Sequence, residues 1–153
     1  MKLPPDWNEL IGLLSSHRVG FLIVEAHALA ASGRPRATQD LDILVEPTSE
    51  NAGRLGAALA AFGFPALANE AHRFAEPDRM VTLGRPPLRI DVMTSITGVS
   101  IEQAWNGRLQ AIVNGHAVGF RGRNELIANK RASGRPKDLA DLALLAELDE
   151  AEE

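Results

Sequence analysis

Apolar residues between positions 21 and 45 follow strand-like spacings that are interrupted by a stretch of small residues. The segment Phe21 to Val24 is continuously apolar, which is typical of a strand buried on both faces. The small residues from Ala26 to Ala31 predict a short helix that ends near Gly33. A basic loop and a second strand, with apolar residues at alternate positions, are predicted to follow.

The second strand carries two acidic residues, Asp40 and Asp42, on either side of Leu41. Because side chains alternate across a strand, both carboxylates lie on one face, about 7 Å apart along the chain. Leu41, Ile43 and Val45 then face a core. The polar face has two open interpretations, a site for divalent cations, which prefer carboxylate oxygens, or an exposed strand surface.

A third carboxylate is predicted on a later strand, where Arg89 and Asp91 alternate with apolar residues. This strand also has one buried face and one polar face. Asp91 therefore either joins the first two carboxylates or pairs with a neighbouring arginine on a solvated surface.

Helical and strand spacing predicts the remaining elements. Asp6 is the expected N-cap of an amphipathic helix over residues 6–17, and a second helix is expected to end at Gly63. In the C-terminal helix, Leu139 is the first of four leucines expected to form a core edge. The other predicted elements are strands over residues 72–75, 80–83, 88–92, 109–113 and 117–120 and helices over residues 100–106, 124–132 and 136–148.

Composition limits the classes of protein that fit this pattern. The chain of 153 residues is 45% hydrophobic and shows no linker or repeat, so we expect a single domain over residues 1–153. With no cysteine, disulfides and thiolate zinc sites are excluded. No segment approaches the roughly 18 apolar residues of a membrane span, and the N-terminus lacks a signal-peptide pattern, so a cytoplasmic protein without a membrane partner is predicted.

Charge is unevenly distributed. A net charge of −4 argues against a protein that coats nucleic acid, but it leaves room for a local basic cleft. Basic residues cluster at Arg34 and Arg36 and again from Arg121 to Lys137. For Arg131 and Arg135, a solvated helix face and a functional role stay open.

Together these residues resemble the nucleotidyltransferase superfamily of the DNA polymerase beta type. Its pattern is a hydrophobic strand, a glycine-containing turn that opens a helix, Asp-x-Asp on the next strand and a third Asp later. The resemblance covers nearly the whole chain. It is carried most specifically by HALAASGRPRATQDLDILV, DVMTSITGVSIEQAW and NKRASGRPKDLADLALL, which are similar to small stand-alone bacterial nucleotidyltransferases related to abortive-infection toxins and to minimal antitoxin-type nucleotidyltransferases.

The resemblance implies an α/β (α+β) nucleotidyltransferase fold, a mixed sheet flanked by helices with a helical C-terminal segment. It also implies a Mg²⁺-dependent (or Mn²⁺-dependent) enzyme that transfers a nucleoside monophosphate from a nucleoside triphosphate (NTP) to a hydroxyl acceptor, which is RNA such as tRNA, a protein or a small molecule. Asp40 and Asp42 would bind the metal ions. Asp91 would complete the metal site nearest the nucleophile and assist its deprotonation.

The same resemblance assigns nucleotide binding to two regions. Arg36 and Thr38 lie in the loop before the Asp-x-Asp strand, and Lys130 and Lys137 match positions that face the cleft in similar proteins.

The turn position is occupied by Glu25 and Ala26, where the family pattern has Gly-Gly or Gly-Ser. Glycine would let backbone amides approach the triphosphate, whereas glutamate adds bulk and negative charge. Glu25 therefore turns away, binds a metal or weakens nucleotide binding. The last possibility defines an alternative function, a catalytically impaired nucleotidyltransferase-fold binding module that acts with a cognate toxin or antitoxin.

Overall fold

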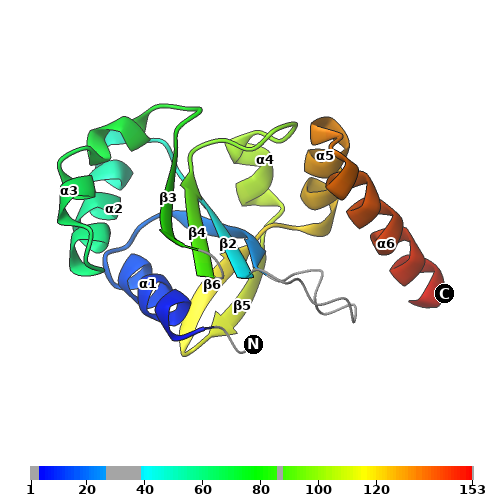
Figure 1. Ribbon diagram of the computed structural model, residues 1–153, viewed down its shortest axis with the longest axis horizontal. Helices are drawn as coiled ribbons and strands as arrows, with labels where there is room; N and C mark the ends of the chain where they lie inside the picture. Colours follow the sequence, from blue (N-terminus) through cyan, green and yellow to red (C-terminus); the bar gives the residue numbers. More distant parts are fainter. Residues whose placement is uncertain (1–3, 27–38, 86–87, 153) are drawn as a thin grey trace.

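The computed structural model describes residues 4–26, 39–85 and 88–152 as a mixed α/β fold on a six-stranded sheet of order β3-β4-β2-β1-β6-β5 (Figure 1). The sheet is mixed because β2 pairs in parallel with β4 and antiparallel with β1. Its strands are β1 (Phe21–Ala26), β2 (Gln39–Val45), β3 (Met80–Arg85), β4 (Leu88–Met93), β5 (Leu109–Val113) and β6 (His116–Phe120). The described helices are α1 (Pro5–Ser16), α2 (Ser49–Ala61), α3 (Pro65–Ala68), the 3-10 helix η2 (Ala71–Ala75), α4 (Ile101–Asn106), α5 (Arg123–Ser133) and α6 (Pro136–Glu152).

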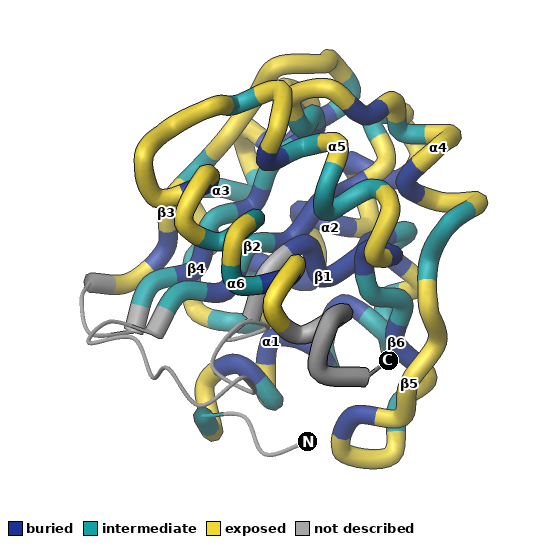
Figure 2. Tube along the Cα trace, turned by 90° about the vertical axis from the view of Figure 1, so that its right-hand side faces the viewer, coloured by how far each residue is buried: buried dark blue, intermediate teal, exposed yellow. Residues whose placement is uncertain are grey.

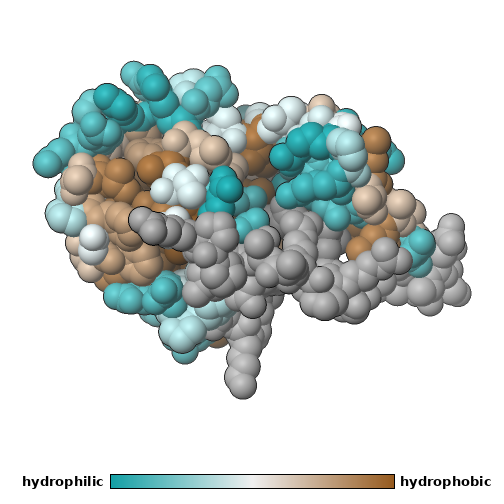
Figure 3. All heavy atoms as spheres, viewed as in Figure 1, coloured by the Kyte–Doolittle hydropathy of each residue, from teal (hydrophilic) through white to brown (hydrophobic). Residues whose placement is uncertain are grey.

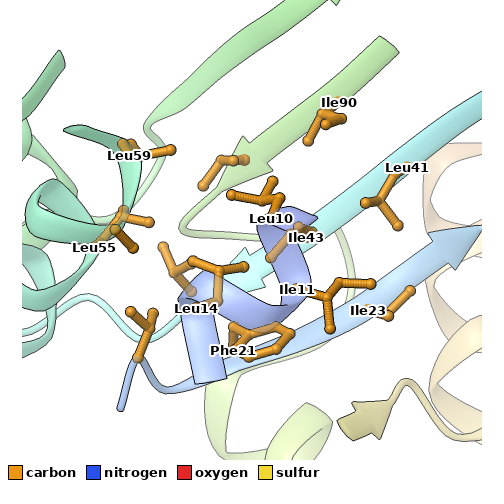
Figure 4. Close-up of a cluster of buried hydrophobic side chains, with 14 of the residues drawn as sticks. Leu10, Ile11, Leu14, Phe21, Ile23, Leu41, Ile43, Leu55, Leu59 and Ile90 are labelled. Atoms are coloured by element: carbon orange, nitrogen blue, oxygen red, sulfur yellow. The ribbon is translucent and has the colours of Figure 1, made fainter. Parts of the chain in front are cut away.

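The main core lies on the sheet face covered by α1 and α2, as Figure 4 shows in close-up. Leu10 and Leu14 of α1 and Leu55 of α2 are completely buried. They belong to one cluster with the alternate residues of β2, which are Leu41, Ile43 and Val45. The predicted core face of β2 is therefore confirmed.

A smaller core covers the opposite face of the sheet. Leu22, Val24 and Leu44 pack with Val99 and with Ala104 of α4. Figure 2 shows the buried residues concentrated on the central strands, whereas β5 at the sheet edge is mostly exposed. Since side chains alternate along β2, Asp42 lies on the same face as Leu44, beside this smaller core.

The buried side chain of Asn51 connects the start of β1 to the end of β2. The side-chain oxygen of Asn51 accepts a 2.6 Å hydrogen bond from the backbone N–H of Gly20. Its side-chain nitrogen donates to the carbonyl oxygens of Gly20 at 3.0 Å and Glu46 at 2.9 Å. One side chain on α2 thus satisfies backbone groups next to both strands and ties the helix to the central sheet.

Several predicted elements match the structure. The hairpin of β5 and β6 turns at Asn114 and Gly115, whose φ angles of 51° and 83° suit a tight hairpin turn. The predicted strand at residue 80 and the break at Gly134, which adopts a left-handed conformation with φ 62°, are also confirmed.

Other local predictions are wrong. The N-cap of α1 is Pro4 without a side-chain hydrogen bond, and Asp6 lies within the first turn, because proline suits the start of a helix. Residues 72–75 belong to η2 instead of a strand, with Ala71 and Phe74 buried at the spacing of one 3-10 turn. Leu139 is 56% exposed, since it does not share the buried face of α6 that contains Leu145.

The predicted turn at Glu25 and Ala26 is a further correction. Strand β1 continues through Ala26, and its pairing with β2 places Glu25 opposite Asp42 after a register shift that begins at Ile23. The remainder of the helix predicted up to Ala31 lies outside the described residues.

No helix in the described part of the chain combines the length and apolar character that a membrane crossing requires.

Candidate functional site

The acidic residues of three strands lie in one row across the sheet. Pairing places Glu25 of β1 opposite Asp42 of β2, and Asp42 beside Asp91 of β4. Neighbouring strands are about 4.8 Å apart, so the backbones of Asp42 and Asp91 are direct neighbours. The prediction that the two acid-bearing strands lie side by side is confirmed. The row ends at Thr82 of β3, which pairs with Asp91.

Asp42 and Asp91 line a cleft of ≈580 Å³ between the sheet and the α5–α6 region. Hydrophilic residues gather over α5 in Figure 3. Asp40 is not among the lining residues, and it pairs in a separate row with Arg89. The charges of Asp40 and Asp42 both act on Arg89, so the convergence of the three carboxylates on one cleft stays a prediction for Asp40. The charged and amide side chains that line the cleft are Asp42, Arg89, Asp91, Asn129, Lys130, Arg135 and Asp138.

Asp91 is held in place by two donors. The Thr82 hydroxyl donates a 2.6 Å hydrogen bond to its Oδ1, and Arg89 Nε donates to the same oxygen at 3.2 Å. Among the described residues, none donates a hydrogen bond to Oδ2 of Asp91. The carboxylate is thus oriented through one oxygen, while the other can serve as a metal ligand or proton acceptor.

Arg89 supplies positive charge to this acidic row. Its hydrogen bond to Asp91 and the charge of that carboxylate raise the pKa of its guanidinium, and the charges of Asp40 and Asp42 act in the same direction. Arg89 thus acts as an internal counter-ion for all three predicted ligands. In the sequence, the i, i+2 spacing of Arg89 and Asp91 indicates this pairing, because it places both side chains on one strand face.

The two predicted phosphate-binding lysines differ in their surroundings. Lys130 lines the cleft, but its side chain is only 2% exposed. Its Nζ donates a 2.8 Å hydrogen bond to Asp141 Oδ2 and lies 3.8 Å from Asp138 Oδ1. Lys137 is exposed and is not a lining residue. Lys130 therefore connects α5 to α6 through a buried ion pair, whereas Lys137 faces solvent.

Arg135 is a cationic residue of the cleft for which sequence reasoning left the role open. Its Nε donates to Asp138 Oδ2 at 2.7 Å and its Nη2 donates to Asp138 Oδ1 at 3.2 Å. Asp138 is only 1% exposed, whereas Arg135 is 62% exposed. The paired hydrogen bonds fix the plane of the guanidinium at the start of α6 and hold its positive charge at the cleft.

Asp138 makes the stability of this region depend on acid. The hydrogen bond from Arg135 lowers the pKa of Asp138, with further lowering by the charges of Arg135 and Lys130, while burial opposes the shift. Its ionised form therefore stabilises the fold above the unfolded-state pKa of about 3.9, and this contribution is lost as pH falls through the lower folded-state pKa. We expect the free energy of unfolding, measured with urea between pH 7 and pH 3, to fall below about pH 4.

The Asp138→Asn variant should show a shallower acid dependence, since the amide that replaces the carboxylate cannot be protonated in this range. Glu147→Gln, at an exposed position of α6, is the matched control and should keep the wild-type slope. Equal slopes for wild type and Asp138→Asn would contradict the assignment.

A divalent cation fits part of the site. Asp42 and Asp91 offer neighbouring carboxylates of the kind that Mg²⁺ prefers, and Arg89 already supplies one positive charge beside them. Within the described residues, no group of three or more His, Asp or Glu side chains forms a metal-binding cluster. Glu25 is placed only through its backbone pairing, beside Asp42.

Two further predicted residues, Arg36 and Thr38, lie outside the described residues, and Ala26 is placed only as the last residue of β1. Sequence reasoning missed Thr82, whose role follows from the pairing of β3 with β4. It left the role of Arg135 open and did not identify the pairing of Arg135 with Asp138, although the i, i+3 spacing of these residues at a helix start was the available signal.

Comparisons with protein-family models, curated proteins and solved structures find no match to this chain.

Proposed function

We propose that this chain is a Mg²⁺-dependent nucleotidyltransferase with the corresponding fold, which transfers a nucleoside monophosphate from an NTP to a hydroxyl acceptor. The observation that carries the proposal is the placement of Asp42 beside Asp91 on parallel strands, in a cleft that also contains cationic residues. A triphosphate bound through metal needs both kinds of charge within one cleft. The acceptor classes are RNA such as tRNA, a protein or a small molecule.

Asp42 and Asp91 are the residues that would hold Mg²⁺ or Mn²⁺, with Asp40 as the predicted third ligand and Glu25 as a further candidate through its place in the row. The ion, when bound, supplies charge stabilisation for the attacking and leaving oxygens. Asp91 is oriented by Thr82 and Arg89, so its second oxygen can accept the proton of the acceptor hydroxyl.

The chain's own cations would bind the phosphates. Arg135 has the geometry for this task because Asp138 holds its guanidinium at the cleft. Arg89 lines the same cleft and keeps its hydrogen bond to Asp91 through Nε, so its charge adds to the positive side of the cleft. Lys130 contributes through the position of α6 rather than through direct contact, since its ammonium group is buried against Asp141.

The test uses each α-labelled NTP with Mg²⁺ and a cell extract as the source of acceptor. We expect label to appear in one acceptor fraction and to disappear when EDTA removes the metal. Mg²⁺ alone should raise the melting temperature, by about 5 to 10 °C at one hundred times its dissociation constant, because it binds the folded state. Absence of both transfer and the metal-dependent shift would refute the proposal.

A second candidate function is the binding module without catalysis, which acts as one member of a toxin and antitoxin pair. The observation that favours it is the backbone position of Glu25 beside Asp42, which adds a negative charge to a row that already contains Asp91. Like charges about 4 Å apart repel by about 4 kcal/mol at an effective dielectric of 20. Such repulsion would weaken nucleotide binding unless a cation compensates it.

Glu25→Gln separates the two functions because it removes the charge and keeps the size of the side chain. If Glu25 helps to bind Mg²⁺, as the enzyme proposal expects, the variant should bind Mg²⁺-NTP about tenfold or more weakly. If Glu25 repels the triphosphate, the same variant should bind more tightly. Calorimetric titration measures the affinity, and Glu9→Gln, at an exposed position of α1, is the matched control.

A further inference from the structure

A second hollow lies beside α4, away from the acidic row. Its volume is ≈430 Å³, within the range of about 300 to 1,000 Å³ that is usual for small-molecule sites. It shares no lining residue with the carboxylate cleft. We call it the Trp105 pocket, after the most exposed of its apolar side chains.

The lining of the Trp105 pocket is largely apolar. Leu22 and Leu44, which are buried residues of the smaller core, line it together with Ile101 of α4. Trp105 is 40% exposed and forms a wall. Trp105 and the half-buried Ile101, both on α4, therefore offer the apolar surface that a ligand can contact.

Arg108 holds the Trp105 ring in place. Its guanidinium carbon lies 4.2 Å from the ring centroid, and its Nη1 donates a 2.7 Å hydrogen bond to the Trp105 carbonyl oxygen. Arg108 and Trp105 both line a second, separate hollow, but Arg108 does not line the Trp105 pocket. The indole ring thus stands between the two hollows, with the pocket free of cationic side chains among its described lining residues.

Two carboxylates stand at the edge of the Trp105 pocket. Glu46 and Glu102 are both exposed lining residues. Neither forms an ion pair with a described residue. A largely apolar lining, an aromatic wall and two uncompensated carboxylates together favour a ligand that is apolar at one end and positively charged at the other.

We propose that the Trp105 pocket binds a small organic cation, an alkyl or aryl group that carries a protonated amine. The apolar part lies against Trp105 and Ile101, and the ammonium group lies near Glu46 and Glu102. The pocket is too small for a partner helix, which has a diameter of about 10 Å with its side chains. This proposal is independent of the proposed nucleotidyl transfer.

The test titrates the full chain with hexylamine and with two probes of matched length, hexanol and hexanoate. The fluorescence of Trp105 is the signal, because the other tryptophan, Trp7, is completely buried. We expect a saturable change with hexylamine at a concentration several-fold lower than with hexanol, and no saturable change with hexanoate. Trp105→Phe should remove the signal and thereby identify its source.

Charge recognition is tested with the double variant Glu46→Gln/Glu102→Gln. It should weaken hexylamine binding roughly threefold to tenfold, since two exposed carboxylates are neutralised. Glu9→Gln/Glu147→Gln makes the same change in net charge at exposed positions of α1 and α6 and should bind as the wild type does. Equal affinity for hexylamine and hexanol, equal weakening in both double variants, or the lack of saturation would each overturn the proposal.

Discussion

Replacing Lys130 by methionine is expected to lower the free energy of unfolding by about 3 to 5 kcal/mol. The ammonium group is 2% exposed and is paired with Asp141 and Asp138, both of which lie on α6. Methionine keeps much of the side-chain volume but leaves the Asp141 carboxylate without this cation in a region with little access to water. Urea unfolding of both proteins, with the m-value fitted for each, measures the difference.

Lys137→Met is the matched control because the same substitution then occurs at an exposed lysine on the same helix as Asp138. It should change the free energy of unfolding by no more than about 0.5 kcal/mol. A double variant, Lys130→Met/Asp141→Leu, should recover part of the loss, since both members of the pair are then replaced by apolar groups. A Lys130→Met variant as stable as Lys137→Met would show that the ion pair does not hold α6 against α5.

This contrast between two lysines shows where sequence reasoning reached its limit. Both residues lie in one basic segment, and the family resemblance assigned both to phosphate binding. The structure distinguishes the two lysines because Lys130 is buried between α5 and α6, whereas Lys137 is exposed on α6. Successive residues of a helix point about 100° apart, so Lys137 can be exposed while its neighbour Asp138 is buried. Whether a lysine is available to a ligand depends on its partners, and the partner Asp141 is eleven residues away from Lys130.

The acidic row was more accessible to prediction from the sequence. Alternation of apolar and polar residues correctly placed the core faces of β2 and β4, because a strand with one buried face has a fixed period of two residues. The register between the strands could not be predicted in the same way. Pairing of Asp42 with Asp91, and of Asp40 with Arg89, joins segments nearly fifty residues apart and is set by the packing of the whole sheet.

Glu25 shows a different limit. The family pattern expected a turn at this position, whereas strand pairing continues through Ala26 with a shift of register after Ile23. Glutamate, unlike glycine, has no particular preference for a turn. The backbone N–H and C=O groups of the neighbouring β2 can therefore pair with those of Glu25 and Ala26 and extend β1. The consequence for the site is that the backbone of Glu25 lies in the same row as those of Asp42 and Asp91.

Replacing Asp42 or Asp91 by asparagine is expected to reduce nucleotidyl transfer about 10³-fold, which corresponds to about 4 kcal/mol of transition-state stabilisation. Asparagine keeps the shape of each side chain and removes the charge that would bind the metal. The same variants should lose the Mg²⁺-dependent rise in melting temperature. Without metal, Asp91→Asn should be no more stable than the wild type, because it removes the ion pair with Arg89. Label transfer and thermal melting with and without Mg²⁺ measure the two effects.

Asp6→Asn, on the opposite side of the sheet, is the control and should retain both transfer and the metal-dependent shift. Asp40→Asn tests the boundary of the site. If Asp40→Asn loses as much nucleotidyl transfer as Asp42→Asn does, the Asp-x-Asp pair acts as the sequence resemblance implies. The cleft must then close around Asp40 when substrate binds. If Asp42→Asn and Asp91→Asn both keep the shift produced by Mg²⁺, the ion binds elsewhere, and the side-by-side carboxylates of β2 and β4 serve only to balance Arg89.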